Sequence, residues 1–273
     1  MVTDREELIG LIKDGLGEPS WLVAAWLGGS DATGRVDRFS DVDLQLVVGD
    51  DAIEKAFSAI ESILGGPSGI DHYWRVAEPT WHGHAQAVFR PRGAPGHLCL
   101  DLLVIQRSAA DWFFDPERHG DAVIISDRER ILGSVSLDRV SLTERRRLLL
   151  QHHAQALPIV LETVAKSIQR GHVVEAIQGY HQNILRPLID LLRCEHCPDR
   201  FDFGFRYLDR DLPPTEQEML TELASVGGLP DLVSRFNRAR NEIMTRLERL
   251  QAGGEAVPPP GSKSPGSIGR NPV

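Results

Sequence analysis

The sequence predicts an α+β protein, with a small mixed β-sheet and its helical cover in the first half and an α-helical bundle in the second. Short apolar runs bounded by Gly, Pro and Asp recur in the first half, which is typical of buried strands. From Leu142 onward the apolar residues follow helical spacing instead. Residues 252–273 are rich in Pro and Gly and cannot bury a core, so we expect them to be disordered. The expected domains are therefore 1–139 and 140–251.

The first half is expected to alternate helices with strands. Gly15 should end a leading helix, and Asp50 or Asp51 can cap a helix that the run Gly65-Gly66-Pro67 stops. The loop PRGAPG (91–96) should join two strands as a hairpin. In chain order, the expected elements are a helix over 4–15, strands over 21–27 and 44–48, a helix over 51–64, strands over 86–90 and 97–105, a helix over 109–114 and a strand over 122–126.

The second half is expected to be helical throughout. Ser141 or Thr143 can cap a long helix, which Pro158 should kink or split because proline removes a helical hydrogen bond. Gly171 should end this helix. Further helices are expected over 173–192, 216–225 and 230–250.

The first two strands are bounded by the most informative polar residues of the chain. Gly29 and Ser30 follow the first strand, and Asp41 and Asp43 open the second. Side chains alternate along a strand, so both Asp side chains should point to the same face. Two carboxylates this close repel each other unless a cation neutralises them, and carboxylates together with substrate phosphates are typical ligands of Mg²⁺. Gly29 allows close approach of a ligand, and Ser30 offers a hydroxyl and an amide to a phosphate.

The segment LGGSDATGRVDRFSDVDLQLVV, which contains these residues, resembles the signature of the polymerase-β-like nucleotidyltransferase superfamily. The resemblance implies a third carboxylate on a later strand, and Asp101 fits because it is the one charge in an apolar run. It further implies that Asp41, Asp43 and Asp101 are catalytic and hold Mg²⁺, as two ions, while Gly29 and Ser30 bind the phosphates of ATP or another NTP.

A catalytic α/β half followed by a helical bundle also resembles the antibiotic nucleotidyltransferases, which modify aminoglycosides and lincosamides. This resemblance implies transfer of a nucleoside monophosphate, AMP when the donor is ATP, to a hydroxyl of a small acceptor such as an aminoglycoside-like compound. It also implies a role in antibiotic resistance. The helical half would wall the acceptor pocket.

Composition narrows the possible partners. The net charge is −9, and residues 1–139 hold 13 Lys and Arg against 23 Asp and Glu, so we expect no binding of long nucleic acid. The acidic first half should instead attract metal ions and cationic acceptors. No apolar stretch is long enough to span a membrane, and three Cys residues without a signal-peptide pattern indicate a cytoplasmic protein. The oligomeric state is left open.

Several alternatives remain at this stage. The chain could be a regulatory enzyme that nucleotidylates (AMPylates) a protein, as antitoxins of this superfamily do, and the run from Arg147 to His152 loosely matches the Arg-x4-6-His motif of their helical toxins. It could also bind nucleotides without catalysis. The general base is not assigned, and its candidates are Glu78, His82, His84, Asp111 and Glu162. Five aromatic residues are expected in the core or in a pocket wall rather than stacked on a nucleobase: Trp26, Trp74, Trp81, Trp112 and Tyr180.

Overall fold

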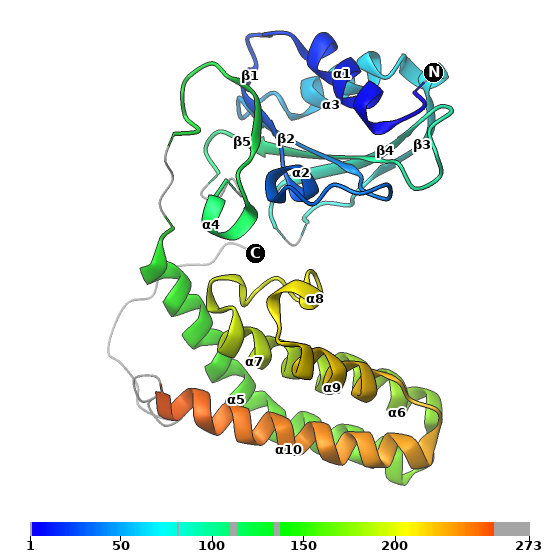
Figure 1. Cartoon of the computed structure of the whole chain (residues 1–273), viewed down its shortest axis with the longest axis vertical. Coiled ribbons are helices and arrows are strands. Elements are labelled where there is room, and N and C mark those ends of the chain that lie inside the picture. The colour runs from blue at the N-terminus through cyan, green and yellow to red at the C-terminus, as the bar shows by residue number, and fades with distance from the viewer. Residues whose placement is uncertain (1, 81, 110–113, 134–136, 254–273) are drawn as a thin grey trace. The chain divides into compact units, whose positions relative to one another are not determined.

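The structure is a computed structural model that describes residues 2–80, 82–109, 114–133 and 137–253 of the 273-residue chain. It divides into two compact units, Met1–Leu137 and Asp138–Val273 (Figure 1). The expected disordered tail lies almost entirely outside the described residues. Within the described ranges, no helix combines the length and the apolar character that crossing a bilayer would need.

The first unit is built on a six-stranded mixed sheet with the strand order β3-β4-β5-β2-β1-β6. β2 and β5 are parallel, and every other neighbouring pair is antiparallel. The strands are β1 (Leu22–Leu27), β2 (Val42–Val48), β3 (Ile70–Arg75), β4 (Ala85–Pro91), β5 (Leu100–Gln106) and β6 (Val123–Asp127). The helices are α1 (Arg5–Leu16), α2 (Gly29–Thr33), α3 (Ile53–Ile63), the 3-10 turn Gly66–Gly69 and α4 (Pro116–His119).

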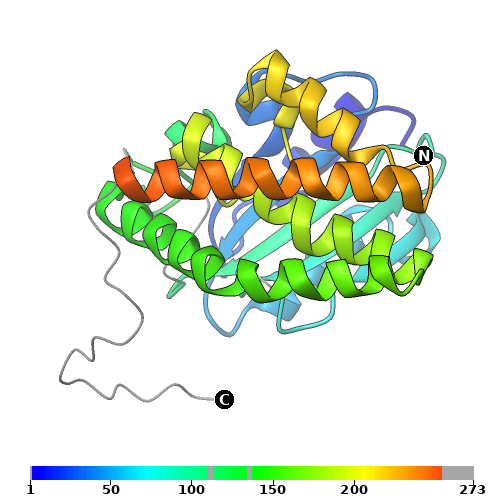
Figure 2. The same cartoon turned by 90° about the horizontal axis from the view of Figure 1, so that it is seen from below.

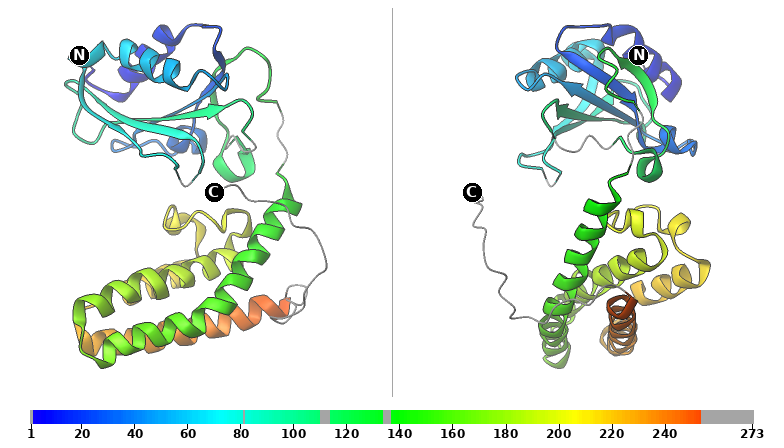
Figure 3. Two further views of the ribbon diagram at one scale, coloured as in Figure 1. Left: turned by 180° about the vertical axis from the view of Figure 1, so that it is seen from behind. Right: turned by 90° about the vertical axis from the view of Figure 1, so that its left-hand side faces the viewer.

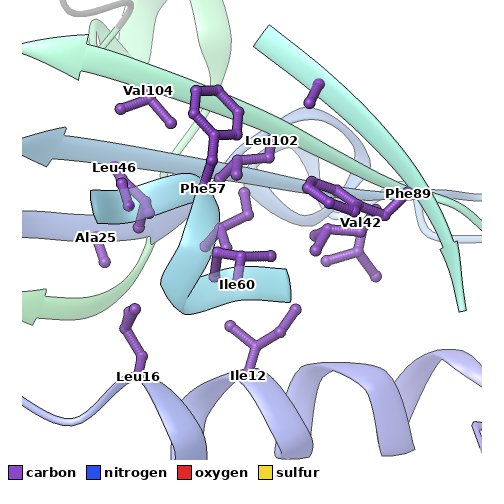
Figure 4. Packing of buried hydrophobic residues seen from close by; sticks show 14 of the residues in the cluster. Ile12, Leu16, Ala25, Val42, Leu46, Phe57, Ile60, Phe89, Leu102 and Val104 are labelled. Carbon is purple, nitrogen blue, oxygen red and sulfur yellow. The ribbon is translucent and has the colours of Figure 1, made fainter. Parts of the chain in front are cut away.

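The main core of this unit lies between one face of the sheet and the helices α1 and α3, which cover the same side (Figure 3). Figure 4 shows how Ile12 and Leu16 of α1 and Phe57 and Ile60 of α3 approach this face. The alternate residues of β2, β4 and β5 fill the space between them. A smaller apolar cluster around Trp26 covers part of the opposite face.

The second unit is a helical bundle. Its helices are α5 (Arg139–Gln169), α6 (Val173–Tyr180), α7 (Arg186–His196), α8 (Leu208–Asp211), α9 (Pro214–Ala224) and α10 (Leu229–Gly253). A π-helical turn, His181–Leu185, joins α6 to α7, and a 3-10 turn spans Pro198–Arg200. α10 packs along α5 and α7 (Figure 2), and the apolar sides of these helices enclose a single core.

The predicted α+β class is confirmed, with differences in individual elements. The edge strand β3 and the short helices α2 and α4 were not predicted, because none of them carries a long apolar pattern. The predicted capping of α3 by Asp50 or Asp51 is wrong: Ala52 occupies the cap position without a side-chain hydrogen bond, and Asp50 Oδ1 accepts one from the Ser108 amide at 3.1 Å instead.

The long helix of the second unit was expected to kink or split at Pro158. α5 continues through Pro158 rather than splitting there, and its axis bends along its course (Figure 2). The predicted helix over 173–192 extends to His196 and contains the π-helical turn. Most of the predicted helix over 109–114 lies outside the described residues.

Candidate active site

Two of the predicted site acids lie side by side in the centre of the sheet. Asp43 on β2 is the direct register partner of Asp101 on β5. The residues on either side of each acid are buried against α1 and α3, so the alternation of the strand turns both acids to the opposite face. Neighbouring strands lie about 4.8 Å apart. The two carboxylates therefore share one site on the face that these helices leave open.

The surroundings of this pair favour a bound cation. Burial, followed by the charges of Asp101, Asp41 and Asp31, raises the pKa of Asp43 to about 6 from its ordinary value of 3.8, while Arg5 opposes the change. Burial also raises the pKa of Asp101. Among the described residues, no Lys or Arg forms an ion pair with either acid. Carboxylates in this state gain from a cation that neutralises both of them.

Asp41 lies just before β2, at the solvent-exposed edge of the same site. Its Oδ1 accepts a hydrogen bond from the backbone amide of Cys99 at 3.0 Å, and its backbone carbonyl accepts one from Arg5 Nε at 3.3 Å. Its negative charge raises the pKa of both Asp43 and Asp101, which are half-buried, although it is not the largest cause for either. The carboxylate is therefore close to the pair while its Oδ1 is held by the backbone.

The turn after β1 brings Gly29 against one of the acids. The amide of Gly28 donates to the backbone carbonyl of Asp43 at 2.9 Å. Gly29 has a φ of +53°, and a Cβ at this position would lie 1.9 Å from Asp43 Oδ2. Only glycine fits this conformation and this contact without rearrangement. The carboxylate of Asp43 thus rests directly on the backbone of the loop that the sequence predicts to bind phosphate.

Ser30 follows at the start of α2 and has an unusual hydroxyl. Its Oγ is buried and has no hydrogen-bond partner among the described residues. A buried hydroxyl without a partner is costly, and an oxygen of a bound ligand would accept its hydrogen bond. The turn itself is well fixed, because Arg5 pairs with Asp31 and Thr33 Oγ1 donates to the carbonyl of Gly29 at 3.0 Å.

A hydrogen-bonded chain that the sequence analysis missed orients Asp101. Gln86 on β4 donates from Nε2 to both oxygens of Asp101, at 2.8 and 3.0 Å. His82 Nδ1 lies 3.1 Å from the backbone amide of His84, from which it accepts, so the ring proton sits on Nε2 and can be donated to Gln86 Oε1 at 3.2 Å. This donation fixes the Gln86 amide with its NH₂ toward the acid. The signal in the sequence was the position of Gln86 on the polar side of its strand.

The other candidates for a general base are placed differently. Glu78 is exposed and pairs with Arg75 at 2.9 Å. His84 is buried, and Glu162 is exposed on α5 in the other unit. Asp111 lies outside the described residues. His82 is therefore the candidate that the described structure connects to an acid of the site, through Gln86.

The aromatic residues that were expected in the core or in a pocket wall differ in their exposure. Trp26 and Tyr180 are fully buried, as expected for core residues. Trp74 was expected in the core or a pocket wall, but it is 63% exposed because it lies on the edge strand β3. Trp81 and Trp112 lie outside the described residues.

Comparisons with known proteins add little to this geometry. No protein-family model matches the sequence, and no curated protein matches it significantly. One similar solved structure is described as the crystal structure of an aminoglycoside 6-adenyltransferase from Bacillus subtilis. The two chains are 14% identical, the match covers 92% of each, and the TM-score is 0.35. A TM-score this low does not establish a common fold.

Proposed function

We propose that this protein is a magnesium-dependent nucleotidyltransferase that moves AMP from ATP to a hydroxyl group of a small acceptor. The observation that carries the proposal is the contact between the acid pair and the glycine-serine turn. Asp43 is in register with Asp101 and at the same time rests on the backbone of Gly29, beside the unpartnered hydroxyl of Ser30. The acids and the turn that the sequence predicts to bind phosphate thus lie together, which supports the proposal.

The donor set fits Mg²⁺. Asp43 and Asp101 would hold the metal, with Asp41 joining them from the edge of the site. Within the described parts of the chain, no three His, Cys, Asp or Glu side chains are already grouped around one point. Mg²⁺ usually takes one or two protein carboxylates and completes its shell with substrate phosphates and water. When bound, Mg²⁺ would neutralise charge on the phosphates and on the attacking oxygen.

The residues of the chain have separate tasks in the proposed reaction. The backbone at Gly29 and the hydroxyl of Ser30 bind the β- and γ-phosphates, which form the leaving group. The acceptor oxygen bonds to the α-phosphorus, the bond from that phosphorus to the bridging oxygen breaks, and its electron pair leaves with pyrophosphate. Asp101 accepts the hydroxyl proton and is held in place by Gln86. Most of the rate gain comes from positioning and charge neutralisation.

The alternative of a protein-modifying enzyme gains no specific support. Arg147 is paired with Glu144 through two hydrogen bonds, at 2.7 and 2.8 Å, and His152 is exposed on the same helix. The arginine of the toxin-like motif is thus engaged within its own helix turn. The other alternative is a protein that binds nucleotides without catalysis, and a turnover assay separates it from the proposed transferase.

The proposal is tested by nucleotide binding and by turnover. We expect calorimetry to detect an ATP analogue with a non-cleavable α,β bond in the presence of Mg²⁺ and not in EDTA. Asp43→Asn should abolish this binding, whereas Asp51→Asn, a change at an exposed acid on the loop before α3, should not. Pyrophosphate release from ATP and Mg²⁺ with small hydroxylated acceptors measures turnover. Metal-independent binding, or full activity of Asp43→Asn, would contradict the proposal.

A further inference from the structure

The open face of the sheet carries a row of side chains that extends from the acid pair to the edge strand. Asp43 on β2 is in register with Asp101 on β5. Asp101 is in turn in register with Val88 on β4, and Val88 with Trp74 on β3. Directly opposed residues of a sheet point to the same face. With strands about 4.8 Å apart, Trp74 begins about 10 Å from Asp101 on the same surface. Trp74 is 63% exposed.

A positive charge lies beside this row. Arg90 is two residues beyond Val88 on β4 and opposite His72 on β3, so it points to the same face. It is half-buried, and its charge reaches Cys99, where it opposes the rise in thiol pKa that burial causes. In the described part of the chain, the guanidinium of Arg90 forms no ion pair and no side-chain hydrogen bond. A half-buried guanidinium without a partner is available to a ligand oxygen.

The strand order decides which substrate can reach this surface. The glycine-serine turn follows β1, and the order β3-β4-β5-β2-β1 places the acid pair between that turn and β4. Attacking and leaving oxygens lie roughly in line in phosphoryl transfer. If pyrophosphate leaves toward Gly29 and Ser30, the acceptor must approach from the side of β5 and lie over β4 and β3.

We propose that the exposed face of β4 and β3, with Trp74 and Arg90 as its main contacts, binds the acceptor of the nucleotidyl transfer. This inference rests on the proposed function and specifies its substrate. The acceptor is a hydroxylated compound with at least two rings, because it has to reach from Asp101 to a residue two strands, or about 10 Å, away. One ring packs on Trp74, and an oxygen of the acceptor accepts a hydrogen bond from Arg90.

The test separates acceptor binding from nucleotide binding. Pyrophosphate release is measured with ATP, Mg²⁺ and a panel of multi-ring aminoglycosides and lincosamides, for the whole chain and for Trp74→Ala, Trp74→Phe and Arg90→Gln. We expect Trp74→Ala and Arg90→Gln to raise the KM for the acceptor at least tenfold and to leave the KM for ATP within twofold. Trp74→Phe should retain most of the affinity. Ile124→Ala, at a 49% exposed position on the opposite edge strand β6, is the matched control and should change neither constant.

Each other outcome has a definite meaning. Because the Trp74 side chain is mostly exposed, its variants should keep the melting temperature, which confirms that they fold. A raised KM for ATP, or no change in either KM, would overturn the acceptor surface. If no panel member reacts, or if a protein is labelled instead, while the chain still binds the ATP analogue through Asp43, the acceptor surface is wrong and the nucleotide site stands. If that Asp43-dependent binding is itself absent, the proposed function fails.

Discussion

Replacing Asp43 by Asn should make the metal-free protein more stable, and the gain should depend on pH. The pKa of Asp43 is raised from 3.8 to about 6 by burial and by the neighbouring carboxylates. A carboxyl with a higher pKa in the folded state binds its proton more tightly when folded. Its contribution to stability therefore falls as pH rises from about 3.8 to about 6, and the penalty is complete above that range.

The size of the effect follows from the shift. A pKa raised from 3.8 to about 6 corresponds to about 3 kcal/mol of unfolding free energy at pH 8, and to about half of that at pH 5. Asn removes the charge and keeps nearly the same volume, so this value is the upper limit of the expected gain. At roughly 3 °C per kcal/mol for a domain of this size, the melting temperature should rise by up to about 9 °C at pH 8.

The assay is thermal unfolding in EDTA at pH 5 and pH 8 for wild type, Asp43→Asn and the exposed control Asp51→Asn. We expect the gain for Asp43→Asn to be larger at pH 8 than at pH 5, and the control to match wild type at both. Added Mg²⁺ should then stabilise wild type more than Asp43→Asn, because the ion binds the folded state through this carboxylate. A lower melting temperature for Asp43→Asn at pH 8, or a difference that does not change with pH, would refute the reasoning.

Three further predictions concern the groups around the acid pair. Gly29→Ala should abolish activity and destabilise the fold more than Gly34→Ala does. Both positions have left-handed φ values, +53° and +64°, but only at Gly29 would the new Cβ meet Asp43. Equal losses of unfolding free energy would show that this contact is unimportant. Ser30→Ala should weaken binding of the ATP analogue by about 1.5–3 kcal/mol, the value of a hydrogen bond to a charged oxygen. It should leave unfolding free energy unchanged or slightly higher, since the hydroxyl is buried without a partner; unchanged affinity in calorimetry would remove this residue from the site. Gln86→Leu removes both hydrogen bonds to Asp101 and should raise the Mg²⁺ concentration needed for half-maximal activity by about 10–100-fold. An unaltered Mg²⁺ dependence would show that the Gln86 amide does not position Asp101.

Part of the site was readable in the sequence because local patterns specify it. The α+β class follows from short apolar runs in one half and helical spacing in the other. Polar residues at the ends of strands β1 and β2, and a single charge in the apolar run of β5, identified the turn and the acids. The sequence could name these candidate residues because strand alternation and turn chemistry act over a few neighbouring positions.

The long-range partners came only with the tertiary structure. The parallel pairing of β2 with β5 puts Asp43 beside Asp101, residues 58 positions apart along the chain. The same pairing order brings Gln86 to Asp101, and it places Trp74 and Arg90 on the open face. Strand order and register depend on how apolar faces pack across the whole sheet, and a polar edge strand such as β3 leaves little trace in its own sequence. The sequence by itself therefore determined which residues are candidates for the chemistry, and the fold decided which of these candidates meet.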